Sequence, residues 1–159
     1  MRIAVGNDHR GVEIKRFIDE RQRSQGHDDT DFGTATDESV DYPDYARLVA
    51  GQVSRGEADR GILVCGSGIG MAIAANKYRG VRAGLGVSAA AITTSRQHND
   101  LNVLCFPETM SDPDVVMPIV ESFATTEFAG GRHQRRVDKI AEIEQEQGSL
   151  EDESKSCKS

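Results

Sequence analysis

The segment that most constrains the fold is GILVCGSGIGMAIAANK, residues 61–77. Its unbroken apolar run ends at Cys65, and such a run is typical of a central strand in a parallel sheet, which is covered on both faces. The glycines that follow allow a sharp turn, and the residues after them are typical of a helix that ends at Gly80. The segment therefore predicts a strand, a glycine-rich turn and a helix, with Cys65 where the strand ends.

The rest of the chain alternates between strand and helix patterns in the same way. Further strands are expected at residues 2–5, 27–32, 81–87 and 101–106. The polar composition of 27–32 allows that strand only at an edge of the sheet. Helices are expected where apolar residues recur with a period of 3.6, in the segments around 14–18, 41–53, 89–97, 112–123 and 132–147. This alternation predicts the α/β class, with a five-stranded parallel sheet wrapped by helices.

The 159 residues suffice for one domain with its own core and are too few for a two-domain dehydrogenase. We expect residues 1–147 to form that domain. Residues 148–159, GSLEDESKSCKS, are polar with few large apolar groups and are expected to be a disordered tail.

Composition excludes several classes of function. No apolar stretch approaches the ~20 residues that cross a bilayer, and the amino terminus lacks a secretory signal, so a cytoplasmic protein without a membrane role is expected. The net charge of −7 argues against nonspecific nucleic-acid binding. The three cysteines, Cys65, Cys105 and Cys157, lack CxxC spacing, which indicates neither a disulfide framework nor a zinc cluster. Cys105 in a strand and Cys157 in the tail have no predicted role.

Ligands of a doubly wound sheet bind beyond the carboxyl ends of its strands. We expect three segments there: residues 7–9, the loop CGSGIG at 65–70, and the segment before NVLCF. Backbone amides of such a loop, aided by the dipole of the next helix, can bind an anion such as a phosphate or an enediolate.

Two rival interpretations of the loop fit poorly. A dinucleotide fingerprint follows the first strand and has an acidic residue about 20 positions later. This loop follows roughly the third strand, and the residues about 20 positions later, GLGVSAA, include no carboxylate. A phosphatase-type thiolate loop needs an arginine at the end of the turn, where this chain has Met71. A thiol near an anion-binding loop remains, and as a thiolate such a group can accept a proton.

Each candidate residue also has an ordinary structural explanation. A lone cysteine such as Cys65 is commonly just buried, and His98 with Asn99 could simply end a helix. His9 after Asp8 could be part of a turn. Cations at the amino end of a helix oppose its dipole. The position of the cations in the run GGRHQRR at 130–136 is therefore better explained if they bind a phosphate.

Together the motifs resemble one family. NDHRG, DYPDYA, CGSGIGMAIAANK, GVRA, SRQHND and GGRHQRRV occur in this order. They resemble the type B ribose-5-phosphate isomerases, which are kin of the galactose-6-phosphate isomerase subunits. The resemblance covers residues 2 to about 147. It implies a Rossmann-like three-layer α/β/α sandwich, no metal or other cofactor, and a homodimer or tetramer whose active sites are shared between subunits.

The implied reaction interconverts an aldose and a ketose phosphate, ribose 5-phosphate and ribulose 5-phosphate in the pentose phosphate pathway, through an enediolate. Cys65 is implied as the base, Ser67 as a proton relay, and His98 with Asp8 of the other subunit as the ring-opening pair. The other implied site residues contact substrate: Gly66, Gly68, Ile69 and Gly70 at the enediolate, Tyr42 and Asn99 at the sugar, and His9, Arg132, His133 and Arg136 at the phosphate. Family members that lack this cysteine have a glutamate at the position of Met71.

Two departures from the family pattern bear on specificity. Pro107 and Thr109 stand where many members have the glycine and arginine of a Gly-x-Arg motif, and VSAAAI at 87–92 lacks common acidic and tyrosine residues. The alternatives are an isomerase of another sugar phosphate, such as allose 6-phosphate or galactose 6-phosphate, and a noncatalytic sugar-phosphate or nucleotide binding module. Cys65, Ser67 and His98 favour catalysis over binding alone.

Overall fold

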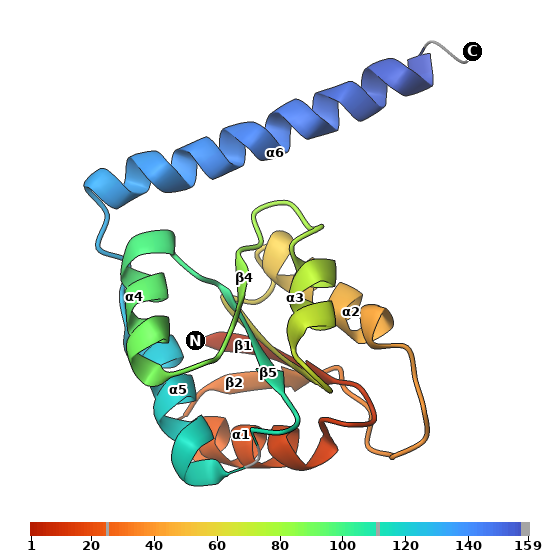
Figure 1. Cartoon of the computed structure of the whole chain (residues 1–159), viewed down its shortest axis with the longest axis vertical. Helices are drawn as coiled ribbons and strands as arrows, with labels where there is room; N and C mark the ends of the chain where they lie inside the picture. Colours follow the sequence, from red (N-terminus) through yellow and green to blue (C-terminus); the bar gives the residue numbers. More distant parts are fainter. Residues whose placement is uncertain (25, 111, 157–159) are drawn as a thin grey trace.

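The computed structural model describes residues 1–24, 26–110 and 112–156, and its centre is a parallel sheet. The sheet has five strands in the order β2-β1-β3-β5-β4 (Figure 1). Their bounds are β1 Arg2–Asn7, β2 Asp28–Asp31, β3 Arg60–Cys65, β4 Ala83–Leu85 and β5 Val103–Pro107. All four neighbouring pairs are parallel. The predicted sheet is confirmed, including the edge position of the polar strand β2.

Helices cover both faces of the sheet. They are α1 Val12–Ser24, α2 Tyr42–Ser54, α3 Ile69–Ala75, α4 Ala89–Asn99 and α5 Pro113–Thr125, and a sixth helix, α6 Arg132–Ser156, follows them in the chain. One apolar core lies between the sheet and α1, α4 and α5, and a second lies between the sheet and α2 and α3. The result is the three-layer α/β/α sandwich that the resemblance implies.

Strand β3 explains why the sheet needs both helix layers. All six of its residues are buried, and alternate side chains of a strand face opposite ways. Ile62 and Val64 accordingly belong to the core under α1, α4 and α5, whereas Leu63 and Cys65 belong to the core under α2 and α3. The sequence of β3 thus fixes the face on which the Cys65 thiol lies.

Three elements differ most from the sequence prediction. β4 is only Ala83–Leu85, and α3 ends at Ala75 before a short turn toward Gly80. α6 continues to Ser156 instead of ending at 147, so residues 148–156 extend the helix where a disordered tail was expected. Cys157 lies outside the described residues. No helix in the described ranges is long and apolar enough to cross a membrane.

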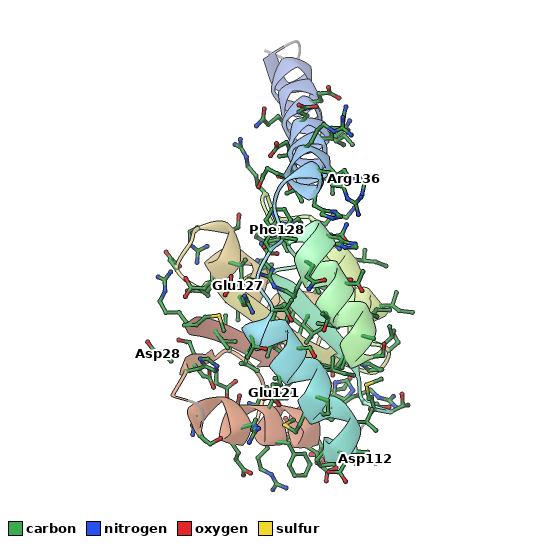
Figure 2. All side chains as sticks on the ribbon, turned by 90° about the vertical axis from the view of Figure 1, so that its left-hand side faces the viewer. Asp28, Asp112, Glu121, Glu127, Phe128 and Arg136 are labelled. Atoms are coloured by element: carbon green, nitrogen blue, oxygen red, sulfur yellow. The ribbon has the colours of Figure 1, made fainter. Side chains whose placement is uncertain are left out.

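Helix α6 leaves the body of the molecule. Figure 2 shows the chain passing Glu127 and Phe128 before it enters the helix, with Arg136 near the start of α6. The helix contacts α4, and the backbone N–H of Gly80 donates to the Glu144 carboxylate at 2.9 Å. Most of its described side chains are exposed, including Ile140 and Ile143. An exposed apolar stripe on a long helix is typical of a surface that packs on another chain.

A buried carboxylate on α1 leads to a stability prediction. Asp19 is buried, its Oδ1 has no hydrogen-bond partner in the described structure, and burial, with Asp31 nearby, raises its pKa to about 6. A raised folded-state pKa means that the charged form destabilises the fold, so stability falls as the pH rises through the window from about 4 to 6. We expect Asp19→Asn to raise the free energy of unfolding by about 1–2 kcal/mol at pH 7.5.

The same substitution should have little such effect at pH 3.5, where Asp19 is protonated in the folded chain and mostly protonated in the unfolded chain. Urea unfolding at the two pH values measures both quantities. The exposed Glu20 on the same helix provides the matched control, Glu20→Gln. A stabilisation that is equal at both pH values would show that the charge of Asp19 is not its cause.

Candidate active site

Cys65 ends β3 beneath the glycine-rich loop, at the carboxyl edge of the sheet. Its side chain is buried, and the backbone N–H of Gly68 donates to its Sγ at 3.2 Å. The exposed Ser67 accepts from the N–H of Ile69 at 3.3 Å. The loop therefore brings together a thiol, a hydroxyl and backbone amides, as the sequence predicts.

The loop has room only for glycine at its tightest points. Gly68 has φ +73°, and a Cβ on it would lie 3.0 Å from the backbone carbon of Phe106. A Cβ on Gly70 would lie 2.7 Å from the ring of Tyr42. Tyr42, the first residue of α2, therefore packs directly on the loop, which places its hydroxyl beside the predicted substrate position. Glycines let the backbone and ring approach this closely.

The end of β1 lies beside the loop and supplies two more predicted residues. Asp8 is buried, its N–H donates to the Val64 carbonyl at 3.1 Å, and its Oδ1 accepts from the N–H of Arg10 at 2.9 Å. The Nδ1 of His9 accepts from the N–H of Val40 at 3.2 Å. An Nδ1 that accepts leaves the proton of a neutral imidazole on Nε2, which is free to donate to a ligand.

His98 and His133 form a second cluster. Their rings stack with centroids 4.0 Å apart and an angle of 7° between planes. His133 is buried, and burial together with the neighbouring His98 lowers its pKa. A neutral His133 can stack on His98 without charge repulsion. The structure thus places His133 where it orients the His98 ring, in addition to its position beside Arg132.

Arg132 and Arg136 lie on the first turns of α6 near this histidine pair. Both are exposed, and their four-residue spacing puts them on one face of the helix. Within the described residues Arg136 makes no ion pair or side-chain hydrogen bond, and the one side-chain hydrogen bond of Arg132 is from its Nε to Nε2 of His133 at 3.4 Å. These two guanidinium groups are available to bind a phosphate. Figure 2 shows Arg136 on the part of α6 closest to the body.

The two clusters lie at opposite ends of the sheet, which corrects one expectation. Cys65 pairs with Pro107 at the carboxyl end of β5, whereas His98 and Asn99 precede Val103 at its amino end. Five residues of strand span about 15 Å. The segment before NVLCF therefore does not join residues 7–9 and 65–70 within one chain, because residues that precede a strand lie at its amino end.

Sequence reasoning missed the group that holds the end of α4. Asp100 follows Asn99 with φ +50°, and it is the one described non-glycine residue with positive φ. Its carboxylate accepts from Arg82 at 2.6 Å and from Arg96 at 2.8 Å. This double ion pair stabilises an unfavourable backbone conformation directly after His98 and Asn99. The motif SRQHND contains both Arg96 and Asp100, but only the structure shows that they pair.

Two hollows lie away from Cys65. One of about 480 Å³ lies along α1, and its lining contains none of the predicted site residues. The other, about 270 Å³, lies between α4 and α6 and includes Asn99 and Ile140 in its lining.

Comparison with known proteins decides the family. Residues 3–140 match the family model described as Ribose/Galactose Isomerase. The chain belongs to this family. Among curated relatives, a putative sugar phosphate isomerase of Bacillus subtilis is 45% identical over 149 residues, covering 91% of this chain and 98% of the relative. Ribose-5-phosphate isomerase B of Escherichia coli is 43% identical over 144 residues, with 91% and 97% covered.

Solved structures of the family share the fold. Ribose-5-phosphate isomerase B of Clostridium thermocellum superposes with a TM-score of 0.89 at 45% identity, covering 92% of this chain and 99% of that one. The enzyme of Mycoplasma genitalium, solved with bound ribulose-5-phosphate, gives a TM-score of 0.87 at 41% identity, with 91% and 97% covered. This Ribose/Galactose Isomerase chain is accordingly an isomerase, and the resemblance drawn from its motifs is confirmed.

Proposed function

We propose that the chain interconverts ribose 5-phosphate and ribulose 5-phosphate with Cys65 as the proton-transferring base. The observation that carries the proposal is the buried Cys65 thiol beneath a glycine-rich loop, with the N–H of Gly68 directed at its sulfur. Relatives named ribose-5-phosphate isomerase B, one of them solved with bound ribulose-5-phosphate, support this substrate. Residues 1–147 are proposed as the isomerase domain, in keeping with the family match to residues 3–140.

In the proposed mechanism Cys65 moves one proton between two carbons. The thiolate removes the C2 proton of the open-chain aldose, and the electrons of the C–H bond form the C1–C2 double bond of an enediolate. Amides of residues 66–70 stabilise the negative oxygen. The thiol then returns the proton to C1, while Ser67 relays a proton from O2 to O1. The product is the ketose, and no atom or electron enters or leaves.

We further propose that each site is completed by a second copy of the chain. Asp8 and Cys65 lie at one end of the sheet and His98 at the other, so one chain cannot bring them together. Apolar side chains are exposed next to each half, with Ile69 and Ile73 on α3 and Ile140 and Ile143 on α6. A symmetric dimer would bury such surfaces and place His98 and Asn99 of one copy over the loop of the other.

In the shared site the remaining residues contact different parts of the substrate. His98 with Asp8 of the other copy opens the furanose ring. The stacking of His98 on His133 fixes the orientation of the His98 imidazole, which donates the proton. Tyr42 and Asn99 contact the sugar hydroxyls. Nε2 of His9 and the guanidinium groups of Arg132 and Arg136 bind the phosphate.

The phosphate assignment predicts the behaviour of Arg136→Ala. Loss of this guanidinium is expected to raise KM for ribose 5-phosphate about tenfold and to change kcat less than about threefold, because the phosphate is distant from the reacting carbons. Steady-state kinetics measures both constants. Arg135→Ala is the matched control, since Arg135 is an exposed neighbour on another face of α6. An unchanged KM in Arg136→Ala would show that Arg136 does not bind the phosphate.

Conversion in both directions tests the proposed function against a noncatalytic binding module. Purified protein supplied with ribose 5-phosphate in one sample and ribulose 5-phosphate in another is expected to give the same final mixture, followed by NMR of the C1 and C2 protons. A binding module would leave both samples unchanged. Allose 6-phosphate and galactose 6-phosphate in parallel samples identify a hexose phosphate isomerase.

A further inference from the structure

An ion pair crosses the outer side of the Cys65 loop. Arg10 donates from Nε to Oε2 of Glu108 at 2.6 Å, and its Nη2 donates to Oε1 of the same carboxylate, which makes the pair bidentate. The two residues are far apart in the sequence. Arg10 follows β1 and Glu108 follows β5, so the pair joins the strands on either side of β3 at their carboxyl ends.

Both partners are in contact with the loop. A Cβ on Gly66 would lie 3.3 Å from Cδ of Arg10, so the arginine side chain runs across the first glycine of the loop. The N–H of Glu108 donates to the carbonyl of Cys65 at 2.8 Å. The guanidinium is thus held at the entrance to the proposed anion-binding loop, one residue after His9.

The charges around Glu108 show why the pair can open. Arg10 keeps the pKa of Glu108 below its usual range and His9 adds to this effect, so the carboxylate is ionised and faces two groups that could otherwise bind an anion. The Arg10 side chain is 55% exposed. Exposed ion pairs are weak because water screens them. A phosphorylated ligand that reaches His9 can therefore compete with Glu108 for the guanidinium.

We propose that Arg10 is a further substrate-binding residue and that Glu108 sets the affinity of the site by competing with the substrate phosphate for it. This inference rests on the proposed function, because it takes the phosphate to lie beside His9. In the free protein Arg10 binds Glu108. In the complex Arg10 binds a phosphate oxygen, and Glu108 remains as a nearby negative charge that weakens binding.

Two substitutions with opposite expected effects test the proposal. Glu108→Gln frees Arg10 and removes the competing charge, so KM for ribose 5-phosphate should fall about threefold to tenfold. Arg10→Gln removes the cation and leaves Glu108 unpaired, so KM should rise about tenfold. Since neither residue contacts the reacting carbons, kcat should stay within about twofold. The matched controls, Arg21→Gln and Glu121→Gln, break an exposed ion pair between α1 and α5 and should leave KM unchanged.

A purely structural role for the ion pair predicts a different result. If the pair only braced the loop, either substitution would break the brace, and both would raise KM or lower kcat. A rise of KM in Glu108→Gln, or an unchanged KM in Arg10→Gln, would overturn the proposal.

Binding measurements separate this proposal from the isomerase assignment. Titration calorimetry with ribose 5-phosphate, on Cys65→Ala protein that also carries each substitution, should show the same opposite changes in Kd without turnover. If the unsubstituted chain binds ribose 5-phosphate but does not convert it, the proposed function fails while the calorimetry still tests Arg10. If the Cys65→Ala protein and the unsubstituted chain both fail to bind ribose 5-phosphate, the role of Arg10 is overturned as well.

Discussion

Replacing Cys65 by alanine is expected to lower kcat for ribose 5-phosphate by about 10³-fold or more, at the upper part of the range for a lost general base. The thiol lies buried beneath the loop with a backbone donor directed at its sulfur. The substitution removes only the sulfur atom and leaves the amides of residues 66–70 in place, so substrate binding should change little. Steady-state kinetics and calorimetry with ribose 5-phosphate measure the two quantities.

Cys105→Ala provides the matched control. Cys105 is fully buried on the neighbouring strand β5, and burial raises the pKa of its thiol, which keeps it protonated and inert. We expect this variant to retain kcat even if its stability falls. Full activity in Cys65→Ala would exclude Cys65 as the base, and equal losses in both variants would indicate a packing defect instead.

The second large effect is the rescue of activity by mixing two inactive variants. Cys65→Ala protein and His98→Ala protein should each be nearly inactive as homodimers. If sites are shared, a mixed dimer contains one site with Cys65 from one copy and His98 from the other, and a second site with neither. Random pairing makes half of all dimers mixed, so about a quarter of the wild-type activity should return after the subunits exchange.

The control for this experiment is each variant unfolded and refolded alone, which should stay inactive. A mixture that remains as inactive as its components would show that each site is built within one chain. The structure makes that outcome hard to reconcile with a role for His98, because His98 lies at the opposite end of the sheet from Cys65.

Much of the fold follows from local patterns in the sequence. The apolar run 61–65 identifies the central strand, because a strand that is buried along its whole length, as Arg60–Cys65 is, must be covered on both faces. The polar segment Asp28–Asp31 is found at the edge, where its side chains can reach water. Helix α6 continues beyond the end predicted at residue 147, because a glycine at 148 and a polar composition are weak indications of a helix end.

The candidate site was predictable in its residues but not in its arrangement. Glycine spacing and the position of Cys65 at a strand end are local features, and the structure places the N–H of Gly68 at the thiol and the ring of Tyr42 on Gly70. The ion pair of Arg10 with Glu108 joins residues 98 positions apart, and no local pattern identifies such a contact. The location of His98 depends on the direction of the chain through β5, and the segment before NVLCF lies at the amino end of that strand instead of the predicted carboxyl end.

The most direct test of the central claim compares two substrates in one preparation. Purified protein, without added metal or nicotinamide, would be supplied with ribose 5-phosphate or allose 6-phosphate, and kcat/KM determined for each. A pentose phosphate isomerase with the proposed shared site should convert ribose 5-phosphate with the higher kcat/KM and form ribulose 5-phosphate. A higher kcat/KM for allose 6-phosphate, or no conversion of ribose 5-phosphate, would contradict the proposed substrate.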